Sequence, residues 1–564
     1  MAGNVAIGIQ KFDKVIEGNY FYIDKTSFIK EWWESGDDVT LITRPRRFGK
    51  TLNMSMVEHF FSVDYPDRGD LFEGLSIWKE EKYRNLQGIY PVISLSFASI
   101  KEDNYEATKL RIYQLLIELY NKHDYLLESG LLTQNEKEFY LSIKMEMKDV
   151  EATIAIYKMA DFLSRYYGKK PIILLDEYDT PMQEAYVHGY WNELTAFTRS
   201  LFNSTFKTNP YMERGIMTGI TRVSKESVFS DLNNLKVVTT TSDEYATSFG
   251  FTEEEVFTAL DLCDLGAEKN EVKRWYDGFV FGKHSDIYNP WSILNFLDTG
   301  EYQTYWANTS GNSLVSKLIR EGSRQVKTGF EALLRGETLI CPIDEQIVYN
   351  QLNGNKASIW SLLLASGYLK VIRREYYNEV GGLHRPEYEL DITNLEVRCM
   401  FESMVQGWFD RVEEEYSDFV EALLMDDLDA MNDYMNSVAV KMFSYFDVGN
   451  NPSENQPERF YHGFVLGLLV DLKNRYCVTS NRESGFGRYD IMLEPKNPAR
   501  DDAIIIEFKV FNARREKSLE DTLASALDQI DEKQYTVNLI AKGIPKGKIR
   551  KYGIAFKGKN VLIG

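Results

Sequence analysis

Cysteine and long apolar runs are both scarce in this chain of 564 residues. Its four cysteines form no CxxC pair and no zinc-ligand spacing; they are Cys263, Cys341, Cys399 and Cys477. This pattern argues against a disulfide framework and fits a reducing compartment. The longest apolar stretches, such as residues 464–470, are far too short to span a bilayer, so no membrane partner is expected.

Histidine is also rare, and no signal sequence is evident. None of the six histidines has a metal-ligand spacing to another, and no Ser–His–Asp pattern is present, which argues against histidine-based catalysis. The first 14 residues lack the basic-then-apolar pattern of a signal peptide, so we expect a cytoplasmic protein. With 44% apolar and 13% aromatic residues, the chain is expected to form several folded domains rather than to be disordered.

Acidic residues outnumber basic ones, 85 Asp and Glu against 65 Lys and Arg, which gives a net charge of −20. This balance argues against loose, non-specific coating of nucleic acid. The charge is unevenly distributed, however. Acid is concentrated in residues 413–433, while residues 44–47 and 542–559 are local basic segments. The distribution predicts contact with phosphate at two confined places.

Strand-like and helical patterns alternate over the first 290 residues, which predicts a parallel sheet covered by helices on both faces. The expected strands are short runs rich in Val, Ile, Leu or Thr, and the clearest helical patterns lie between them. The strands are residues 39–43, 90–97, 171–176, 214–220 and 237–241; the helices are residues 105–121 and 153–167.

Beyond residue 305 the strand signals fade, and a small α/β unit follows at the end of the chain. We expect an α/β protein with a P-loop domain (1–300), a mainly helical middle region (301–448) and a small C-terminal domain (449–564). The middle helices are expected at 331–334, 358–364 and 396–416, with the acidic residues 413–433 as a solvated face and 449–457 as a linker. The C-terminal elements are helices 458–474 and 518–530 and strands 489–493, 503–510, 535–541 and 551–556.

The segment LITRPRRFGKT (41–51) reads as a strand that enters a phosphate-binding loop, with an apolar helix after it. Gly49 lets the main chain approach a phosphate, Lys50 reaches the β- and γ-phosphates, and the Thr51 hydroxyl binds Mg²⁺. Arg44 stands where the Walker A pattern has its first glycine, and Arg44, Arg46 and Arg47 are expected to add positive charge beside the phosphate. The expected cofactor-binding residues of the loop are Arg46, Arg47, Phe48, Gly49, Lys50, Thr51 and Leu52.

A second apolar run, PIILLDEY (171–178), matches a Walker B strand. Asp176 is expected to hold Mg²⁺ and Glu177 to polarise the attacking water. One expected strand, 90–97, lies between the two Walker strands in sequence, which suits the NTPase branch with an added central strand. After the next strand, Thr218 or Thr221 would sense the γ-phosphate, and Arg222 would contact it or act as an arginine finger. The alternatives are an ordinary buried strand and helix start, and nucleotide binding without hydrolysis.

Near the C-terminus, Asp490 precedes a strand that contains Glu507 and Lys509. Because strand side chains alternate, Glu507 and Lys509 share a face, and an antiparallel pairing would bring Asp490 beside Glu507. Two carboxylates can hold Mg²⁺ or Mn²⁺, which activates water, and Lys509 can orient that water. Glu458 is a candidate additional ligand. The bare D…ExK pattern is weak, since many surface hairpins match it.

Further residues support a nucleic-acid substrate without deciding it. Gln529 and Lys533, on the following helix, could contact phosphate or could be ordinary surface residues. Residues 541–560 contain seven Lys or Arg and no acid, which suits a phosphodiester substrate but equally a solvated basic terminus.

These segments together resemble bacterial AAA-ATPase-like proteins that carry a C-terminal PD-(D/E)XK nuclease-superfamily domain. The resemblance covers nearly the whole chain and is carried by GNYFYIDKTSFI (18–29), TRPRRFGKTLNMSM (43–56), LLDEYDTPM (174–182), TGITRVSKESVFS (218–230), WYDGFVFG (275–282), YNPWSILNFL (288–297), YWANTSGN (305–312), ESGFGRYDIML (483–493) and IIIEFKV (504–510). In this family the first glycine of the loop is usually missing.

The resemblance implies an ATP-binding AAA-like domain and a restriction-endonuclease-like domain. Lys50, Thr51 and Asp176 carry over as nucleotide and Mg²⁺ residues. Asp490, Glu507 and Lys509 carry over as the nuclease core, with Glu458 as the first acidic position and Glu483 in reserve.

We therefore expect a P-loop ATPase coupled to a Mg²⁺-dependent nuclease that acts on DNA or RNA. Homo-oligomerisation is plausible, because single AAA-type modules often need a neighbour's arginine. The alternative is a nucleotide-regulated binding or signalling switch whose nuclease-like domain is catalytically inactive.

Overall fold

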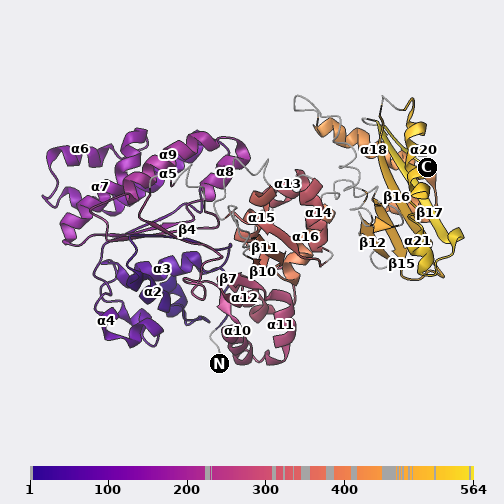
Figure 1. The fold of residues 1–564 in the computed structure, drawn as a ribbon. Helices are drawn as coiled ribbons and strands as arrows, with labels where there is room; N and C mark the ends of the chain where they lie inside the picture. The colour runs from indigo at the N-terminus through magenta and orange to yellow at the C-terminus, as the bar shows by residue number, and fades with distance from the viewer. Residues whose placement is uncertain are drawn as a thin grey trace, which may run out of the picture. The chain divides into compact units, whose positions relative to one another are not determined.

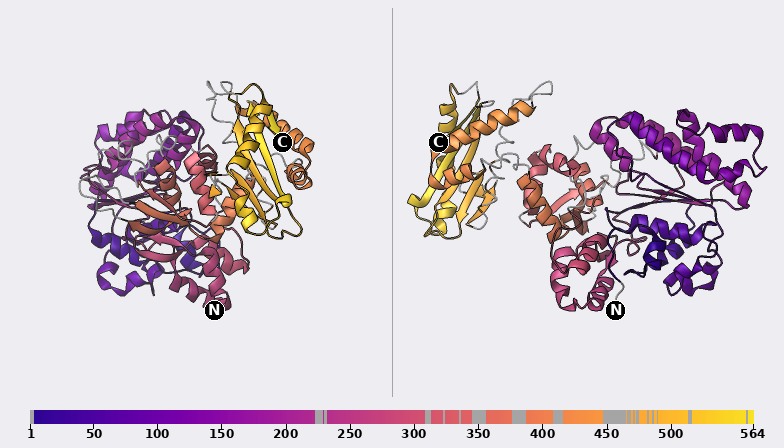
Figure 2. Two further views of the ribbon diagram at one scale, coloured as in Figure 1. Left: turned by 45° about the vertical axis from the view of Figure 1, so that its right-hand side comes forward. Right: turned by 180° about the vertical axis from the view of Figure 1, so that it is seen from behind.

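The structure, a computed structural model, describes most of the chain in two compact units, Met1–Met400 and Phe401–Gly564 (Figures 1 and 2). The described residues are 4–222, 229, 232–307, 313–321, 324–334, 336–344, 356–375, 387–407, 416–446, 465, 469, 472, 475–480, 483–484, 487–488, 490–512, 516–557 and 560–564.

A five-stranded parallel sheet forms the centre of the first unit, in the order β2-β3-β4-β1-β5. Its strands are β1 (Val39–Thr43), β2 (Val92–Ser96), β3 (Ile172–Asp176), β4 (Arg214–Gly219) and β5 (Leu235–Val238). β1 and β3 are buried along their whole length, as continuous apolar runs in a doubly covered sheet should be. The strand order places β4 between the two Walker strands, so the ends of β1, β3 and β4 meet at one edge of the sheet. This arrangement confirms the expected α/β parallel-sheet fold.

Helices cover both faces of this sheet (Figure 1). One face carries α2 and α3, and the other carries α5, α7 and α9 (Figure 1). The helices of this part are α1 (Phe12–Glu17), α2 (Ser27–Ser35), α3 (Lys50–Phe61), α4 (Glu81–Arg84), α5 (Tyr105–Lys122), α6 (Gln134–Ser142), α7 (Asp149–Tyr167), α8 (Thr180–His188) and α9 (Trp191–Phe206).

The rest of the first unit contains two small antiparallel sheets among helices. The first, β6-β8-β7, belongs to the group β6 (Phe251–Thr252), α10 (Glu253–Leu262), α11 (Lys269–Tyr276), β7 (Phe279–Phe281), β8 (His284–Tyr288) and α12 (Pro290–Thr299). The second, β10-β11-β9, belongs to the group α13 (Ser313–Glu321), α14 (Arg324–Leu334), β9 (Leu339–Pro342), α15 (Lys356–Ala365), β10 (Leu369–Glu375), β11 (Glu387–Ile392) and α16 (Leu395–Gly407). The sequence predicted parts of α14, α15 and α16, at residues 331–334, 358–364 and 396–416, of which 408–415 lie outside the described residues. It did not predict α13, and it missed the sheet, whose strands mix charged and apolar residues.

The second unit is built on a mixed five-stranded sheet in the order β12-β15-β16-β17-β18. β16 and β17 are parallel and are joined through α20, while the other neighbours are antiparallel. Its elements are α17 (Tyr416–Met425), α18 (Leu428–Phe446), β12 (Tyr476–Ser480), β13 (Glu483–Ser484), β14 (Gly487–Arg488), β15 (Ile491–Pro495), β16 (Ala503–Val510), α20 (Leu519–Glu532), α21 (Val537–Ala541), β17 (Ile549–Lys557) and β18 (Asn560–Ile563).

Apolar residues of α17 and α18, including Phe419 and Met435, share one core with Ile491 and Ile506 of the sheet. This core combines helices that precede the predicted boundary at residue 448 with strands that follow it. The acidic run 413–433 therefore lies partly on helices whose other face is buried.

Two expected elements differ from the structure. The expected linker 449–457 lies outside the described residues, and one expected helix lies largely outside them. Residues 535–541 were expected as a strand, but Val537–Ala541 is a short helix in which Val537 and Ile540 are exposed. The expected strand 237–241 begins two residues earlier, as β5. The expected helix 458–474 is described only at residues 465, 469 and 472.

None of the helices in the described part of the chain combines the length and the apolar character needed to cross a bilayer.

Candidate functional site

The loop between β1 and α3 has the form of a phosphate-binding loop. Gly49 adopts a left-handed conformation (φ 79°) directly before α3, which a side chain would disfavour. The Lys50 ammonium group lies under the loop and donates to the carbonyl oxygens of Arg44 and Pro45, at 3.0 and 2.9 Å. Burial lowers the pKa of Lys50, and the nearby carboxylates of Glu177 and Asp176 oppose that shift. Because an ammonium group has three N–H donors, Lys50 can reach a phosphate either with its third donor or by exchanging these carbonyl contacts.

Arg44 does not lie beside the phosphate position, contrary to the sequence prediction. Its side chain is fully buried and donates to the carbonyl oxygens of Thr43, Thr239 and Glu244, at 3.0, 2.6 and 3.2 Å. Burial lowers the pKa of the guanidinium to about 9, so it remains charged at neutral pH. Arg44 is therefore a structural residue of the loop, and its charge is directed inward.

The other loop residues divide into polar and apolar positions. The half-buried Arg46 guanidinium donates to the Gln183 amide oxygen at 3.2 Å, and the exposed Arg47 lies 4.3 Å from the Trp291 ring centroid. Phe48 is buried, and Leu52 packs against the core below α3. The side chains of Phe48 and Leu52 therefore face away from a phosphate, and their contribution to nucleotide binding would come from the main chain.

Asp176, at the end of β3, is the centre of a polar cluster. Its carboxylate accepts a hydrogen bond from the Thr51 hydroxyl at 2.7 Å and a second, short one from Thr218. Burial raises the pKa of Asp176, and these two hydroxyl groups oppose the shift. Hydroxyl and carboxylate oxygens are the ligands that Mg²⁺ prefers, so Thr51 and Asp176 fit the ion implied by the loop.

Glu177 follows directly and is held in a left-handed conformation (φ 51°), which is unfavourable for a residue with a side chain. Its amide donates to the Thr218 hydroxyl oxygen at 3.3 Å, and its carboxylate accepts from the Thr180 hydroxyl at 3.2 Å. These contacts fix the carboxylate just beyond the strand end, beside the Thr51–Asp176 pair.

Asp179 is a residue of this site that the sequence reading missed. One of its carboxylate oxygens accepts from the amides of Ile220 and Thr221 and from the Thr221 hydroxyl, at 3.0, 2.8 and 2.9 Å. The sequence does contain a signal for this residue, because Asp179 is the third acidic residue of the run DEYD (176–179). Thr218 and Thr221 are thus both bound to Walker B carboxylates, and Arg222 lies half-buried directly after them.

In the second unit, Asp490 and Glu507 lie side by side as the sequence predicts. β15 and β16 are antiparallel with Ile491 opposite Ile506, and the Asp490 carboxylate accepts from the Phe508 amide at 2.8 Å. The Asp490 amide donates to the Glu507 carboxylate at 3.3 Å. Burial, together with the charge of Asp490, raises the pKa of Glu507 to about 8. A divalent cation would relieve this repulsion, and two carboxylates are suitable oxygen ligands.

Residues of α20 and its C-terminal turn complete this site. The Gln529 amide donates a short hydrogen bond to the Glu507 carboxylate and another to the Tyr535 hydroxyl oxygen at 3.2 Å. The Lys509 ammonium donates to the Ser525 hydroxyl oxygen at 2.9 Å. Sequence reasoning gave Gln529 as a phosphate contact or an ordinary surface residue and did not predict its contact with Glu507. It also missed Tyr535 and Ser525, while Lys533 is exposed. Glu458 lies outside the described residues, and the side chain of Glu483 is likewise not described.

Several basic residues of the C-terminal segment 542–559 form ion pairs with acidic side chains. Lys542 pairs with Glu494, Lys551 with Asp531, and Arg550 with Asp502. A nucleic-acid strand would have to compete with these carboxylates, so the segment is a weaker phosphate-binding surface than its composition implies.

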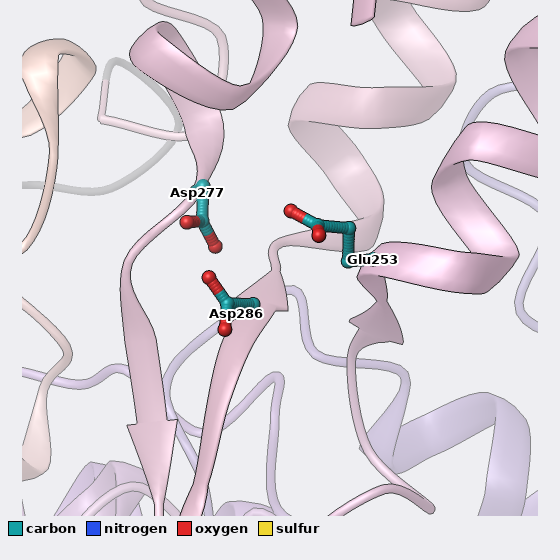
Figure 3. Close-up of side chains that lie close together, drawn as sticks. All are labelled: Glu253, Asp277 and Asp286. Carbon is teal, nitrogen blue, oxygen red and sulfur yellow. The ribbon is translucent and has the colours of Figure 1, made fainter. Parts of the chain in front are cut away.

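Glu253, Asp277 and Asp286 form a separate acidic cluster, with ligand oxygens within 4.8 Å of one another (Figure 3). Figure 3 shows the carboxylates of Asp277 and Asp286 pointing toward each other. Burial and the charge of Asp286 raise the pKa of Asp277 to about 7. The Lys273 ammonium pairs with Glu253 and, at 3.1 Å, with Asp286, so the cluster already contains a cation. The sequence reading did not identify this cluster.

Comparison with known proteins finds a family match for the region that contains each candidate site. Residues 6–229 match the AAA-ATPase-like family, described as "Predicted AAA-ATPase", and residues 456–564 match the PD-(D/E)XK nuclease superfamily. The chain is also 25% identical over 563 residues to an "Uncharacterized protein in vnfD 5'region" of Azotobacter chroococcum mcd 1, covering 98% of this chain and 96% of that protein. The resemblance predicted from the sequence motifs is confirmed.

Proposed function

We infer that this chain is an ATP-dependent enzyme that cleaves nucleic acid, because residues 6–229 belong to the AAA-ATPase-like family and residues 456–564 to the PD-(D/E)XK nuclease superfamily. ATP with Mg²⁺ binds at the loop before α3, and phosphodiester bonds are cleaved at Asp490 and Glu507. The observation that carries the proposal is a pair of oxygen-bearing side chains in each unit, at the residues that the sequence motifs predict as metal ligands. Asp176 lies against Thr51 in the first unit, and Asp490 lies against Glu507 in the second.

In the ATPase half, the main-chain amides at the start of α3 face the β-phosphate and stabilise its charge. Lys50 moves from the carbonyls of Arg44 and Pro45 to the phosphates. Thr51 and Asp176 would hold Mg²⁺, which neutralises charge on the phosphates. Glu177, fixed by Thr180 and by its own amide contact to Thr218, accepts the proton of the attacking water.

In the nuclease half, Asp490 and Glu507 would bind a divalent cation that activates water and offsets the charge developing on the phosphate. Lys509 leaves Ser525 and orients the water, or stabilises the pentavalent transition state. Gln529 holds the Glu507 carboxylate in place through its amide. ATP binding to the first unit gates or positions this second reaction.

The ATPase half is tested by the affinity for MgATP of wild type and Lys50→Ala, measured by isothermal titration calorimetry. We expect the substitution to weaken binding at least tenfold, because it removes the cation that reaches the phosphates. Lys170→Ala, which removes an exposed charge just before β3, at the opposite end of that strand from Asp176, is the matched control and should have a much smaller effect. An unchanged affinity in Lys50→Ala would remove the ATP claim.

The nuclease half is tested by incubating purified protein with DNA and RNA, with Mg²⁺ or Mn²⁺, and with or without ATP. Asp490→Ala and Lys509→Ala should each abolish cleavage. Glu494→Ala, on the same strand as the active carboxylate but paired with Lys542, should cleave like wild type. Cleavage that persists in Asp490→Ala would identify a contaminant.

A second candidate is a nucleotide-regulated switch whose nuclease-like unit is inactive. The observation that favours it is the Lys509 contact, since the ammonium is bound to Ser525 instead of to either carboxylate. Wild-type protein that binds ATP yet cleaves no substrate under any of these conditions would support this reading.

A further inference from the structure

The first half of the phosphate loop, residues 44–48, is held by segments that lie far along the chain. At its start, Arg44 donates to the carbonyls of Thr239 and Glu244, and the Phe281 ring covers its guanidinium at 4.6 Å. At its end, Phe48 packs against Phe279 and Phe281, with ring centroids 4.7 and 5.4 Å apart. Both ends of this half-loop are therefore held by contacts with residues 239–244 and 279–281.

Pro45 and Arg46 are held in the same way. A Cβ atom on Gly367 would lie 2.8 Å from Pro45 Cγ, so the loop touches the turn before β10 as closely as a glycine allows. The Arg46 carbonyl oxygen accepts from the Trp306 indole N–H at 3.0 Å and from the Asn289 amide at 3.3 Å. Both donors come from sequence motifs, YNPW and YWAN, that neither enzymatic site uses.

Trp306 is itself rigidly placed. It is 2% exposed, and its ring packs against Phe279 and Tyr368, each with a centroid separation of 5.5 Å. Its amide donates to the fully buried carboxylate of Glu396 at 2.6 Å, and that carboxylate also accepts from the Ser292 hydroxyl at 2.8 Å. A buried carboxylate bound in this way fixes the indole N–H toward the loop.

We propose that Trp306 is a positioning residue of the phosphate loop, and that residues 279–306 with Gly367 form an external brace that replaces the missing first glycine of the Walker A pattern. The proposal rests on the proposed function, because it concerns the loop to which ATP is assigned. When Lys50 leaves the Arg44 and Pro45 carbonyls for a phosphate, the loop loses two internal hydrogen bonds. The Trp306 contact to the Arg46 carbonyl then keeps the loop in its binding shape.

The test compares Trp306→Phe with Trp275→Phe in the full-length protein. The first change keeps an aromatic ring but removes the N–H that reaches Arg46. The second removes an indole N–H that contacts Glu271 on its own helix and does not touch the loop. Hydrogen exchange of peptides spanning residues 44–52 is measured without nucleotide, and MgATP affinity and turnover are measured in parallel.

We expect faster exchange of residues 44–52 in Trp306→Phe alone, with a thermal midpoint close to that of Trp275→Phe. MgATP should bind about fivefold more weakly, as the loss of one hydrogen bond implies, with turnover at saturating ATP unchanged because Asp176 and Glu177 are untouched. Exchange equal to that of wild type would overturn the brace. This readout needs no nucleotide, so failure of ATP binding in wild type would defeat the proposed function and leave the exchange result to decide the brace.

Discussion

Arg44 and Glu507 are both buried, but the groups around their charged side chains differ. The guanidinium of Arg44 donates to three carbonyl oxygens and lies against an aromatic ring, and these contacts offset part of the cost of burial, which still lowers its pKa to about 9. The carboxylate of Glu507 is buried beside that of Asp490, and burial together with this like charge raises its pKa to about 8. Arg44 therefore stays charged at neutral pH and has a structural role, whereas Glu507 marks a place where a cation or proton is expected.

Arg44→Gly, which restores the Walker A consensus, should destabilise the first unit by about 3 kcal/mol or more, because it leaves buried carbonyls unpaired and opens a cavity. The measurement is urea unfolding of the full-length protein. Arg47→Gly is the control. Arg47 is exposed and has φ 64°, where glycine is favoured, so its replacement should change stability little or raise it. A neutral Arg44→Gly would contradict the structural role.

The stability of metal-free protein should fall as pH rises from about 4.5 to about 8. Folded Glu507 keeps its proton up to a pKa of about 8, whereas the unfolded chain releases it near 4.5, so its contribution is present below 4.5 and lost through 8. At pH 8, Glu507→Gln should therefore unfold at a higher urea concentration than wild type. Mg²⁺ or Mn²⁺ should stabilise wild type but not Glu507→Gln; equal stabilisation of both would contradict a metal at this pair.

At the scale of elements, α18 closes an open edge of the second unit's sheet. Asn432 and Asn436 each accept from and donate to the main chain of β18, at Ile563 and Val561, with distances of 2.8 to 3.0 Å. Four helical residues advance about 6 Å and two strand residues about 6.6 Å, which is why this pair of asparagines matches alternate strand residues. The helix therefore occupies the hydrogen-bonding edge at which another strand would add.

Asn432→Ala with Asn436→Ala should destabilise the second unit by about 2 kcal/mol, since four hydrogen bonds are lost, and should promote self-association through β18. Urea unfolding and sedimentation velocity measure the two effects. Asp433→Ala, an exposed position on the same helix, is the control. A double variant that stays as stable as the control would show that the edge is closed by other contacts.

The sequence predicted strands best where a continuous apolar run is buried in the sheet. β1 and β16 have the expected bounds because each is an apolar run between polar residues. The strand expected at 535–541 is a helix, because a short apolar run fits either structure and only its surroundings decide. β9, β10 and β11 were missed because their charged residues mask the alternation that identifies a strand.

The candidate site residues fall into two groups: those placed by a local sequence motif, and those whose roles depend on partners distant in sequence. Asp176, Lys50, Asp490 and Glu507 were found because their motifs fix them at strand ends or beside a helix start. Arg44, Asp179 and Trp306 were missed or misjudged because their roles depend on partners more than 40 residues away. No pattern in the neighbouring sequence predicts that the Arg44 side chain is directed into the core, because its acceptors at Thr239 and Glu244 are distant in sequence.

At the scale of the whole molecule, each compact unit contains one of the two candidate sites. Lys50, Asp176 and Glu177 lie in the first unit, and Asp490 and Glu507 lie in the second. Each unit also has its own apolar core, so each can respond to its own ligand. In the proposed function, coupling between ATP binding and cleavage would therefore pass from one unit to the other.

Differential scanning calorimetry should show separable responses of the two units. With Mg²⁺ present throughout, added ATP should raise the transition of the first unit, and Mn²⁺ without nucleotide should raise that of the second, because ATP is assigned to the first unit and the Asp490–Glu507 metal site to the second. Lys50→Ala should abolish the first shift only, and Asp490→Ala the second only. A single transition that both ligands shift equally would contradict independent units.

The most direct test of the central claim is cleavage of nucleic acid by wild type, Lys50→Ala and Asp490→Ala, measured side by side with Mg²⁺ and ATP. The account predicts cleavage by wild type that depends on ATP, strongly reduced cleavage by Lys50→Ala, and none by Asp490→Ala. Wild-type protein that binds ATP but leaves every DNA and RNA substrate intact, with Mg²⁺ or Mn²⁺, would contradict it.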